Sequence, residues 1–183
     1  TLKGDDPQEI ADQARPVWAR AEAAWHDALG KWARGLILDT DTEAWELLRL
    51  SRFGELNPKG RTDSLYGPVN ATWRSLFKAH RAQDFTNVIS IGQTKDEYKD
   101  VVKPGGQKVS ERTGRTIRVG QKEVPYMADV VLRTGRTRDG GFTCTIEKGW
   151  WNAATEGLVF ENDDIRFAYI LSLITETAES EWE

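Results

Sequence analysis

Two polar side chains, Asp39 and Gln93, directly follow two short apolar runs in this sequence. Asp39 comes after Leu36 to Leu38, and Gln93 comes after residues 87–92, Asn-Val-Ile-Ser-Ile-Gly. The apolar runs predict two short buried strands with a helical crossover between them, and such strands should be parallel. Both polar side chains would then lie at the carboxyl edge of one sheet, where open α/β sheets hold their ligands.

The residues after Asp39 also have a purely structural interpretation. Residues 40–43, Thr-Asp-Thr-Glu, form a capping box, in which Thr40 caps a helix over 41–52 and Glu43 reaches back to the Thr40 amide. An aspartate after a strand is itself often a turn former or helix cap. A third interpretation, an unrelated α/β enzyme that uses Asp39 and Glu43 as an acid/base pair, stays open, although capping accounts for Glu43 without chemistry.

Composition indicates an ordinary globular chain, and we expect residues 1–183 to form a single domain. The chain has 39% hydrophobic and 30% charged residues, and no apolar run approaches the length of a membrane helix. Cys144 is the only cysteine, which excludes an intramolecular disulfide and favours a cytoplasmic location. With only His26 and His80 as further soft ligands, a zinc site is nearly excluded. A net charge of −4 argues against general affinity for nucleic acids but leaves local basic patches possible.

The sequence divides into five segments around the predicted strands. An N-terminal helical segment, 1–34, carries an apolar stripe that should pack on the sheet, and the unit 35–93 contains both strands and their crossover. The most basic and glycine-rich segment, 94–122, predicts a long mobile loop, with a solvated surface hairpin as the alternative. Segment 123–175 should hold antiparallel strands and a final helix, and the acidic tail 176–183 should fray. The stripe consists of Val17, Ala21, Ala24, Trp25, Ala28 and Trp32.

This order of parts, over roughly residues 33–175, resembles the RecA-like ATPase core, and more narrowly small phage-encoded, core-only members linked to DNA recombination or annealing. The strand that ends in Asp39 resembles a Walker B strand, and the one that ends in Gly92-Gln93 resembles the sensor strand. The region from Ala128 to Lys148 resembles the next core strand and its hairpin partner. The resemblance implies an α/β fold with a RecA-like, mostly parallel sheet flanked by helices and an antiparallel hairpin toward the C-terminal side.

The resemblance also implies a set of functional residues. ATP and Mg²⁺ would be the cofactors: Asp39 would hold the metal through water, while Thr40 and Gln93 would contact the nucleotide. Gln93 would sense the γ-phosphate, Lys148 would reach the nucleotide of a neighbouring subunit, and Glu43 is a further catalytic candidate. DNA would be bound by Lys95, Lys99, Lys103, Lys108, Arg112, Arg115 and Arg118. Because no aromatic residue lies between Tyr98 and Tyr126, base stacking by this segment should be weak.

The implied function is an oligomeric, DNA-acting ATPase of the recombination, annealing or replication type, in the host cytoplasm if phage-encoded. Its partners would be further copies of itself, DNA (single-stranded in the first instance) and phage or host recombination or replication proteins, with no membrane. Two departures support the alternative of a hydrolysis-deficient binding or assembly module. No G-x-x-x-x-G-K-[ST] motif occurs in the sequence, so the phosphate loop would have to lie upstream of Thr1, and hydrolysis is expected only of a parent chain that carries it. Trp150 follows Lys148-Gly149 where relatives often have Lys-x-Arg.

Overall fold

The computed structural model describes residues 6–31, 35–58, 63–81 and 87–181. The chain forms two compact units, 1–122 and 123–183, and each is described by itself. The boundary coincides with the end of the basic segment that the sequence separates from the C-terminal strands. Unit 1 contains α1 (Pro7–Lys31), β1 (Gly35–Asp39), α2 (Asp41–Phe53), α3 (Asp63–Arg81), β2 (Asn87–Ile91), β3 (Thr94–Val102) and β4 (Lys108–Arg118).

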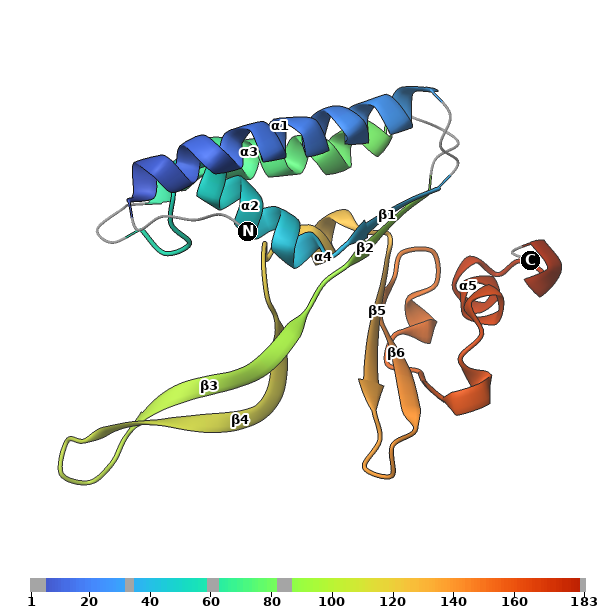
Figure 1. The fold of residues 1–183 in the computed structure, drawn as a ribbon. Coiled ribbons are helices and arrows are strands. Elements are labelled where there is room, and N and C mark those ends of the chain that lie inside the picture. Colours follow the sequence, from blue (N-terminus) through green and yellow to red (C-terminus); the bar gives the residue numbers. More distant parts are fainter. Residues whose placement is uncertain (1–5, 32–34, 59–62, 82–86, 182–183) are drawn as a thin grey trace. The chain divides into compact units, whose positions relative to one another are not determined.

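Three helices supply the core of unit 1, and α1 and α3 lie side by side (Figure 1). Trp73 of α3 is completely buried; its ring packs edge-on against Trp45 of α2 and at a tilt against Phe77. The indole nitrogen of Trp25 donates a hydrogen bond of 3.1 Å to the carbonyl of Leu76, which ties α1 to α3.

The apolar stripe predicted for α1 was largely wrong. Val17 is exposed, and the buried face of α1 consists of Ala11, Ala14, Trp18, Ala28 and Leu29. This face packs on α2 and α3, not on a sheet as predicted. The small alanines allow the helices to approach closely. Trp32 lies outside the described residues.

The predicted strand–crossover–strand unit is confirmed. β1 and β2 pair in parallel, with Gly35 opposite Asn87 and Asp39 opposite Ile91. Their side chains alternate between a half-buried face and an exposed one, and Ile37 on the exposed face is 65% exposed. In the crossover, α3 begins at Asp63, so that Pro68 lies inside the helix.

Residues 94–118 are not the loop that their composition predicts. β3 and β4 form an antiparallel hairpin that turns at Pro104-Gly105-Gly106 and extends away from the helices (Figure 1). Most of its side chains are exposed on both faces. The alternative of a solvated surface hairpin therefore describes this segment. A bulge interrupts the register between Asp96 and Tyr98, and Gly114, on the partner strand there, has a φ of 80° that favours glycine.

Unit 2 contains α4 (Val124–Met127), β5 (Val130–Arg136), β6 (Phe142–Gly149), β7 (Val159–Glu161) and α5 (Phe167–Thr175). Its three strands form one antiparallel sheet in the order β5-β6-β7, which confirms the predicted change to antiparallel pairing. The core of the unit consists of Cys144, Ile146, Phe160, Ile170 and Ile174. Over the described stretches of both units, no helix is long and apolar enough to cross a membrane.

The predicted RecA-like, mostly parallel sheet was wrong. The described strands form three small sheets: one parallel pair, one antiparallel pair and one antiparallel sheet of three strands. A parallel strand needs a crossover of about a dozen residues or more, usually helical, and the described chain places helices before β2 but none between β3 and β4 or between β5 and β6. Tight turns join these later strands, and tight turns produce antiparallel neighbours.

Candidate functional site

Asp39 and Gln93 lie at the same edge of the β1–β2 pair, as predicted. Asp39 is the last residue of β1, opposite Ile91, and Gln93 follows β2 by two residues. Both side chains are exposed. The Asp39 carboxylate makes no hydrogen bond or ion pair with any residue that the structure describes, so it is available to a ligand from solvent.

Thr40 caps α2 as the sequence predicts, but the predicted return bond from the Thr40 amide to the Glu43 side chain is not among the hydrogen bonds of the described residues. The Thr40 hydroxyl accepts a hydrogen bond of 3.2 Å from the amide of Glu43, which satisfies one of the free amides at the start of α2. The Glu43 side chain is exposed. Thr40 is therefore already engaged by the backbone, and the structure gives Glu43 no contact that distinguishes it as a catalytic acid or base.

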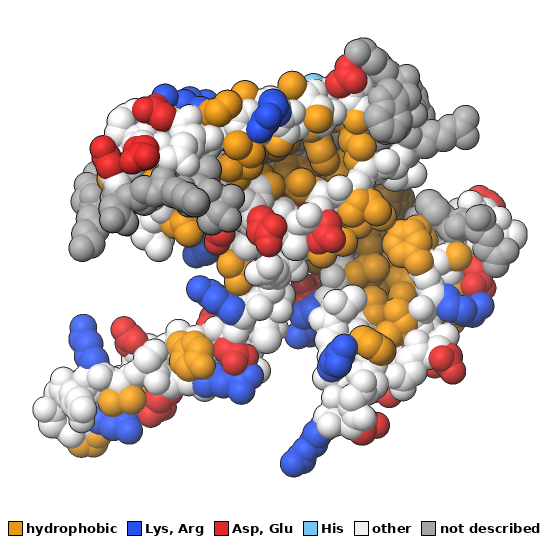
Figure 2. Space-filling view, in the orientation of Figure 1, with side chains coloured by type: hydrophobic (Ala, Val, Ile, Leu, Met, Phe, Trp, Pro, Cys, Tyr) orange, Lys and Arg blue, Asp and Glu red, His pale blue; other side chains and the backbone are white. Residues whose placement is uncertain are grey.

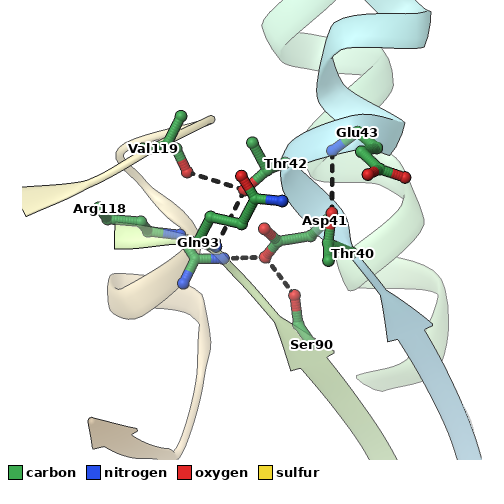
Figure 3. Close-up of polar contacts among 8 residues, drawn as sticks. All are labelled: Thr40, Asp41, Thr42, Glu43, Ser90, Gln93, Arg118 and Val119. Carbon is green, nitrogen blue, oxygen red and sulfur yellow. Dashed lines mark hydrogen bonds and ion pairs between the residues drawn. The ribbon is translucent and has the colours of Figure 1, made fainter. Parts of the chain in front are cut away.

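The buried carboxylate of this region belongs to Asp41, which the sequence did not single out. Asp41 begins α2 and is only 1% exposed. It accepts a hydrogen bond from the Ser90 hydroxyl of β2 and forms an ion pair with the guanidinium of Arg118, at the end of β4 (Figure 3). Burial lowers the pKa of Arg118, whose side chain is 22% exposed.

Thr42, the next residue of α2, holds both strands of the hairpin at their base. Its hydroxyl accepts a hydrogen bond of 3.1 Å from the amide of Gln93 and donates one of 3.2 Å to the carbonyl of Val119 (Figure 3). Val119 and Gln93 are in turn joined by a backbone hydrogen bond of 2.8 Å. The buried hydroxyl thus connects the first turn of α2 to the point where the chain enters and leaves the hairpin.

Some cations of the hairpin are paired with an acidic side chain, and others have no acidic partner among the described residues. Figure 2 shows charged side chains of both signs along the hairpin. Arg112 is paired with Asp96, Lys103 lies 3.9 Å from Glu111, and Arg118 is paired with Asp41. The remaining predicted DNA-binding cations have no acidic partner among the described residues and are exposed. These free cations are Lys95, Lys99, Lys108 and Arg115.

The hairpin also presents one exposed aromatic ring. Tyr98 is 60% exposed, and it lies directly opposite Arg112 in the ladder, so that both side chains are on one face of the ribbon. Lys99 follows Tyr98 on β3, so its side chain lies on the other face. The ribbon therefore offers positive charge on both faces and a planar apolar group on one.

Lys148 is held inside unit 2. Its ammonium donates hydrogen bonds to the carbonyls of Pro125 and Ala128 and lies 5.4 Å from the centre of the Trp150 ring. The predicted role toward a neighbouring subunit would require these hydrogen bonds to break. His26 is exposed on the surface of α1. The described residues contain no group of three or more acidic, histidine or cysteine side chains that could hold a metal ion.

No family model matches the sequence, and comparisons with curated proteins and with solved structures give no match either. The geometry therefore carries the functional argument. It offers an exposed basic ribbon that is fixed at its base by a buried polar cluster, and an exposed carboxylate at the edge of a parallel strand pair. Within the described part of the chain, several cations of the ribbon and this carboxylate have no partner.

Proposed function

We propose that the β3–β4 hairpin is a nucleic-acid-binding arm that contacts the phosphate backbone. The observation that carries this proposal is a set of exposed cations that have no acidic partner among the described residues, on a ribbon whose two faces are largely open: Lys95, Lys99, Lys108 and Arg115. An isolated two-stranded hairpin gains little stability from its own residues, so a long one is best explained by a partner that it contacts.

Charge on the arm favours phosphates although the chain as a whole is acidic. The net charge of the chain is −4, but between Thr94 and Arg118 basic residues outnumber acidic ones. Contacts between lysine or arginine and phosphate release counterions, and they depend on salt but not on base sequence. We therefore expect sequence-independent binding that weakens steeply as salt increases.

Single strands are the expected form of nucleic acid. The exposed ring of Tyr98 offers a surface on which an unpaired base can stack, and every base has a face that can do so. The bases of a duplex are already stacked on one another. The sequence predicted weak stacking because no aromatic residue lies between Tyr98 and Tyr126. Tyr98 itself, at the edge of that stretch, supplies one stacking site.

The test is fluorescence anisotropy with a labelled single-stranded oligonucleotide over a range of salt concentrations. The double variant Lys95→Ala/Lys99→Ala should weaken binding and reduce the salt slope by about 0.7 for each phosphate that the variant no longer neutralises. Arg20→Ala/Lys78→Ala is the matched control, because both of its cations are exposed on helices. Equal slopes for the two double variants would refute the assignment of the arm, and so would failure of the parent protein to bind at all.

Nucleotide binding at the strand edge is the second candidate function, and it is supported by the free carboxylate of Asp39 beside Gln93. The donor set fits Mg²⁺ in part, since this cation is commonly held by one or two carboxylates together with water and substrate phosphates. Asp39 would hold the cation, which would supply charge neutralisation at the phosphates, and Gln93 would hydrogen-bond a phosphate oxygen. The sequence itself contains no phosphate loop, so hydrolysis is not proposed for these 183 residues alone.

Calorimetric titration with Mg²⁺-ATP tests this second candidate. Asp39→Asn should abolish any binding that the parent shows, whereas Asp163→Asn, which neutralises an exposed carboxylate in unit 2, should leave it unchanged. If Asp39→Asn binds as the parent does, Asp39 is not the cation ligand.

A further inference from the structure

The contacts that hold the arm at its base gather on the first turn of α2. Thr42 bonds the backbone on either side of the hairpin, and Asp41 is paired with Arg118, the last residue of β4. Beyond its base, the arm exposes most side chains on both faces. The direction in which the arm points is therefore determined by this small set of polar contacts and by the backbone that continues from β2.

The burial of Asp41 favours a persistent ion pair between Asp41 and Arg118. A carboxylate that is 1% exposed is costly to bury unless it is paired and hydrogen-bonded, so Asp41 strongly favours the arrangement in which Arg118 reaches it. The Nε of Arg118 is buried and has no hydrogen-bond partner within the described part of the chain. The guanidinium is thus oriented by Asp41 and not by an independent network.

Gly92 provides the space that the guanidinium occupies. A Cβ at position 92 would lie 2.5 Å from the central carbon of the Arg118 guanidinium, closer than any ordinary contact. The obstructing atoms are the end of a flexible side chain, so an alanine at this position would displace Arg118 without removing a charge. Substitution of Gly92 therefore changes the position of the Arg118 side chain and leaves its charge in place.

We infer that Asp41 and Arg118 are positioning residues, which hold the arm in its binding-competent orientation and do not contact nucleic acid themselves. The inference rests on the proposed function of the arm and assigns Arg118 a role other than the phosphate contact that the sequence suggests. If the arm is in its binding-competent orientation for only a fraction of the time, the apparent dissociation constant for nucleic acid equals the intrinsic constant divided by that fraction. The number of phosphate contacts in the bound state, however, does not change.

The salt dependence of binding distinguishes positioning from direct contact. Gly92→Ala and Arg118→Ala should each bind single-stranded oligonucleotide about tenfold more weakly, as expected if the arm is competent about a tenth of the time, with the salt slope of the parent. Arg118→Lys, which can still reach Asp41, should recover part of the affinity. Gly67→Ala is the matched control, since a Cβ there meets no atom within 4 Å.

Two outcomes would overturn the inference. If Arg118→Ala lowers the salt slope as Lys95→Ala does, Arg118 is a phosphate contact. If Gly92→Ala binds as tightly as Gly67→Ala, the placement of Arg118 does not affect the arm.

A distance measurement separates this inference from the proposed function. Nitroxide labels at Ser110→Cys on β4 and Arg52→Cys on α2, two exposed positions, report the orientation of the arm by double electron–electron resonance without nucleic acid. The distribution of distances should be narrow with wild-type Gly92 and broad with Gly92→Ala. Broadening in a protein that does not bind oligonucleotide would refute the proposed function and retain the positioning role. An unchanged distribution in a protein that does bind would refute the positioning role alone.

Discussion

Asp39 and Asp41 are two residues apart and have opposite surroundings. Asp39 ends β1 with an exposed side chain, whereas Asp41 begins α2 and is turned inward to Ser90 and Arg118. The change from strand to helix between them causes the difference, because successive side chains of a helix rotate about the axis and do not alternate. The two carboxylates should therefore respond differently to the same substitution.

Asp41→Asn should lower the free energy of unfolding by about 2–3 kcal/mol, because it removes the charge that compensates the partly buried Arg118. Asp39→Asn is the matched control and should change stability by no more than about 0.5 kcal/mol, as is usual for exposed positions. Urea denaturation measures both. Equal effects would contradict the burial and pairing described for Asp41.

The buried thiol of Cys144 should make unit 2 less stable at alkaline pH. Burial raises the pKa of its thiol above the unfolded value of about 8.5, so the unfolded chain loses the proton first. The stabilisation is fully present below about pH 8.5 and is lost as the pH rises through the folded pKa. Unfolding of unit 2 between pH 7 and 10 should show a steeper loss of stability in the parent than in Cys144→Ala. Parallel pH profiles would show that the thiol titrates alike in both states.

At the residue scale, local sequence predicts local contacts and little else. The bond between Thr40 and the Glu43 amide was predictable, because a capping box is defined by residues three positions apart. The pairing of Asp41 with Arg118 joins residues 77 positions apart, and no periodicity or motif indicates such a pair. A charged residue inside a capping box also looks like an ordinary surface residue, so nothing in the local pattern indicates its burial.

Among the elements, α3 contributes the completely buried Trp73 to the core of unit 1. Trp73→Ala should destabilise the unit by about 3–5 kcal/mol, because the substitution leaves a large cavity between Trp45 and Phe77. Leu65→Ala on the same helix is the control: Leu65 is exposed, and the change should cost less than about 1 kcal/mol. Unfolding followed by tryptophan fluorescence tests the pair, and similar costs would mean that α3 is packed differently.

The hairpin shows why exposed strands are hard to predict. A strand is recognised by alternating apolar and polar residues when one face is buried, but both faces of β3 and β4 are largely exposed. Their sequence is consequently charged throughout and predicts a loop. The turn at residues 104–106 does have a sequence signal, because glycines and proline mark a turn whether or not the flanking strands are buried.

For the whole molecule, the division at residue 122 leads us to expect that the two units unfold in separate transitions. The buried tryptophans Trp18, Trp45 and Trp73 all belong to unit 1, whereas Trp150 and Trp151 of unit 2 are exposed. Tryptophan fluorescence should therefore follow unit 1, while hydrogen exchange of β5 and β6 amides follows unit 2. The two denaturation midpoints should differ. Coincident curves would instead indicate a single cooperative transition.

The class of fold was the least predictable property at this scale. The positions of β1 and β2 and their parallel pairing followed from the sequence, but the extended parallel sheet did not form. Sheet membership depends on which strands hydrogen-bond to one another across long separations in sequence. The composition of a strand does not specify the strand with which it pairs. The short turns after β3 and β5 are visible in the sequence, and they favour antiparallel neighbours.

The length of the arm has a consequence for how copies of the protein would share one nucleic-acid strand. The nine residues of β3 span about 30 Å at about 3.4 Å per residue. An arm laid along a single strand would therefore cover about 30 Å of that strand. The length of the hairpin would therefore set a minimum spacing between neighbouring copies on the strand, whatever the base sequence.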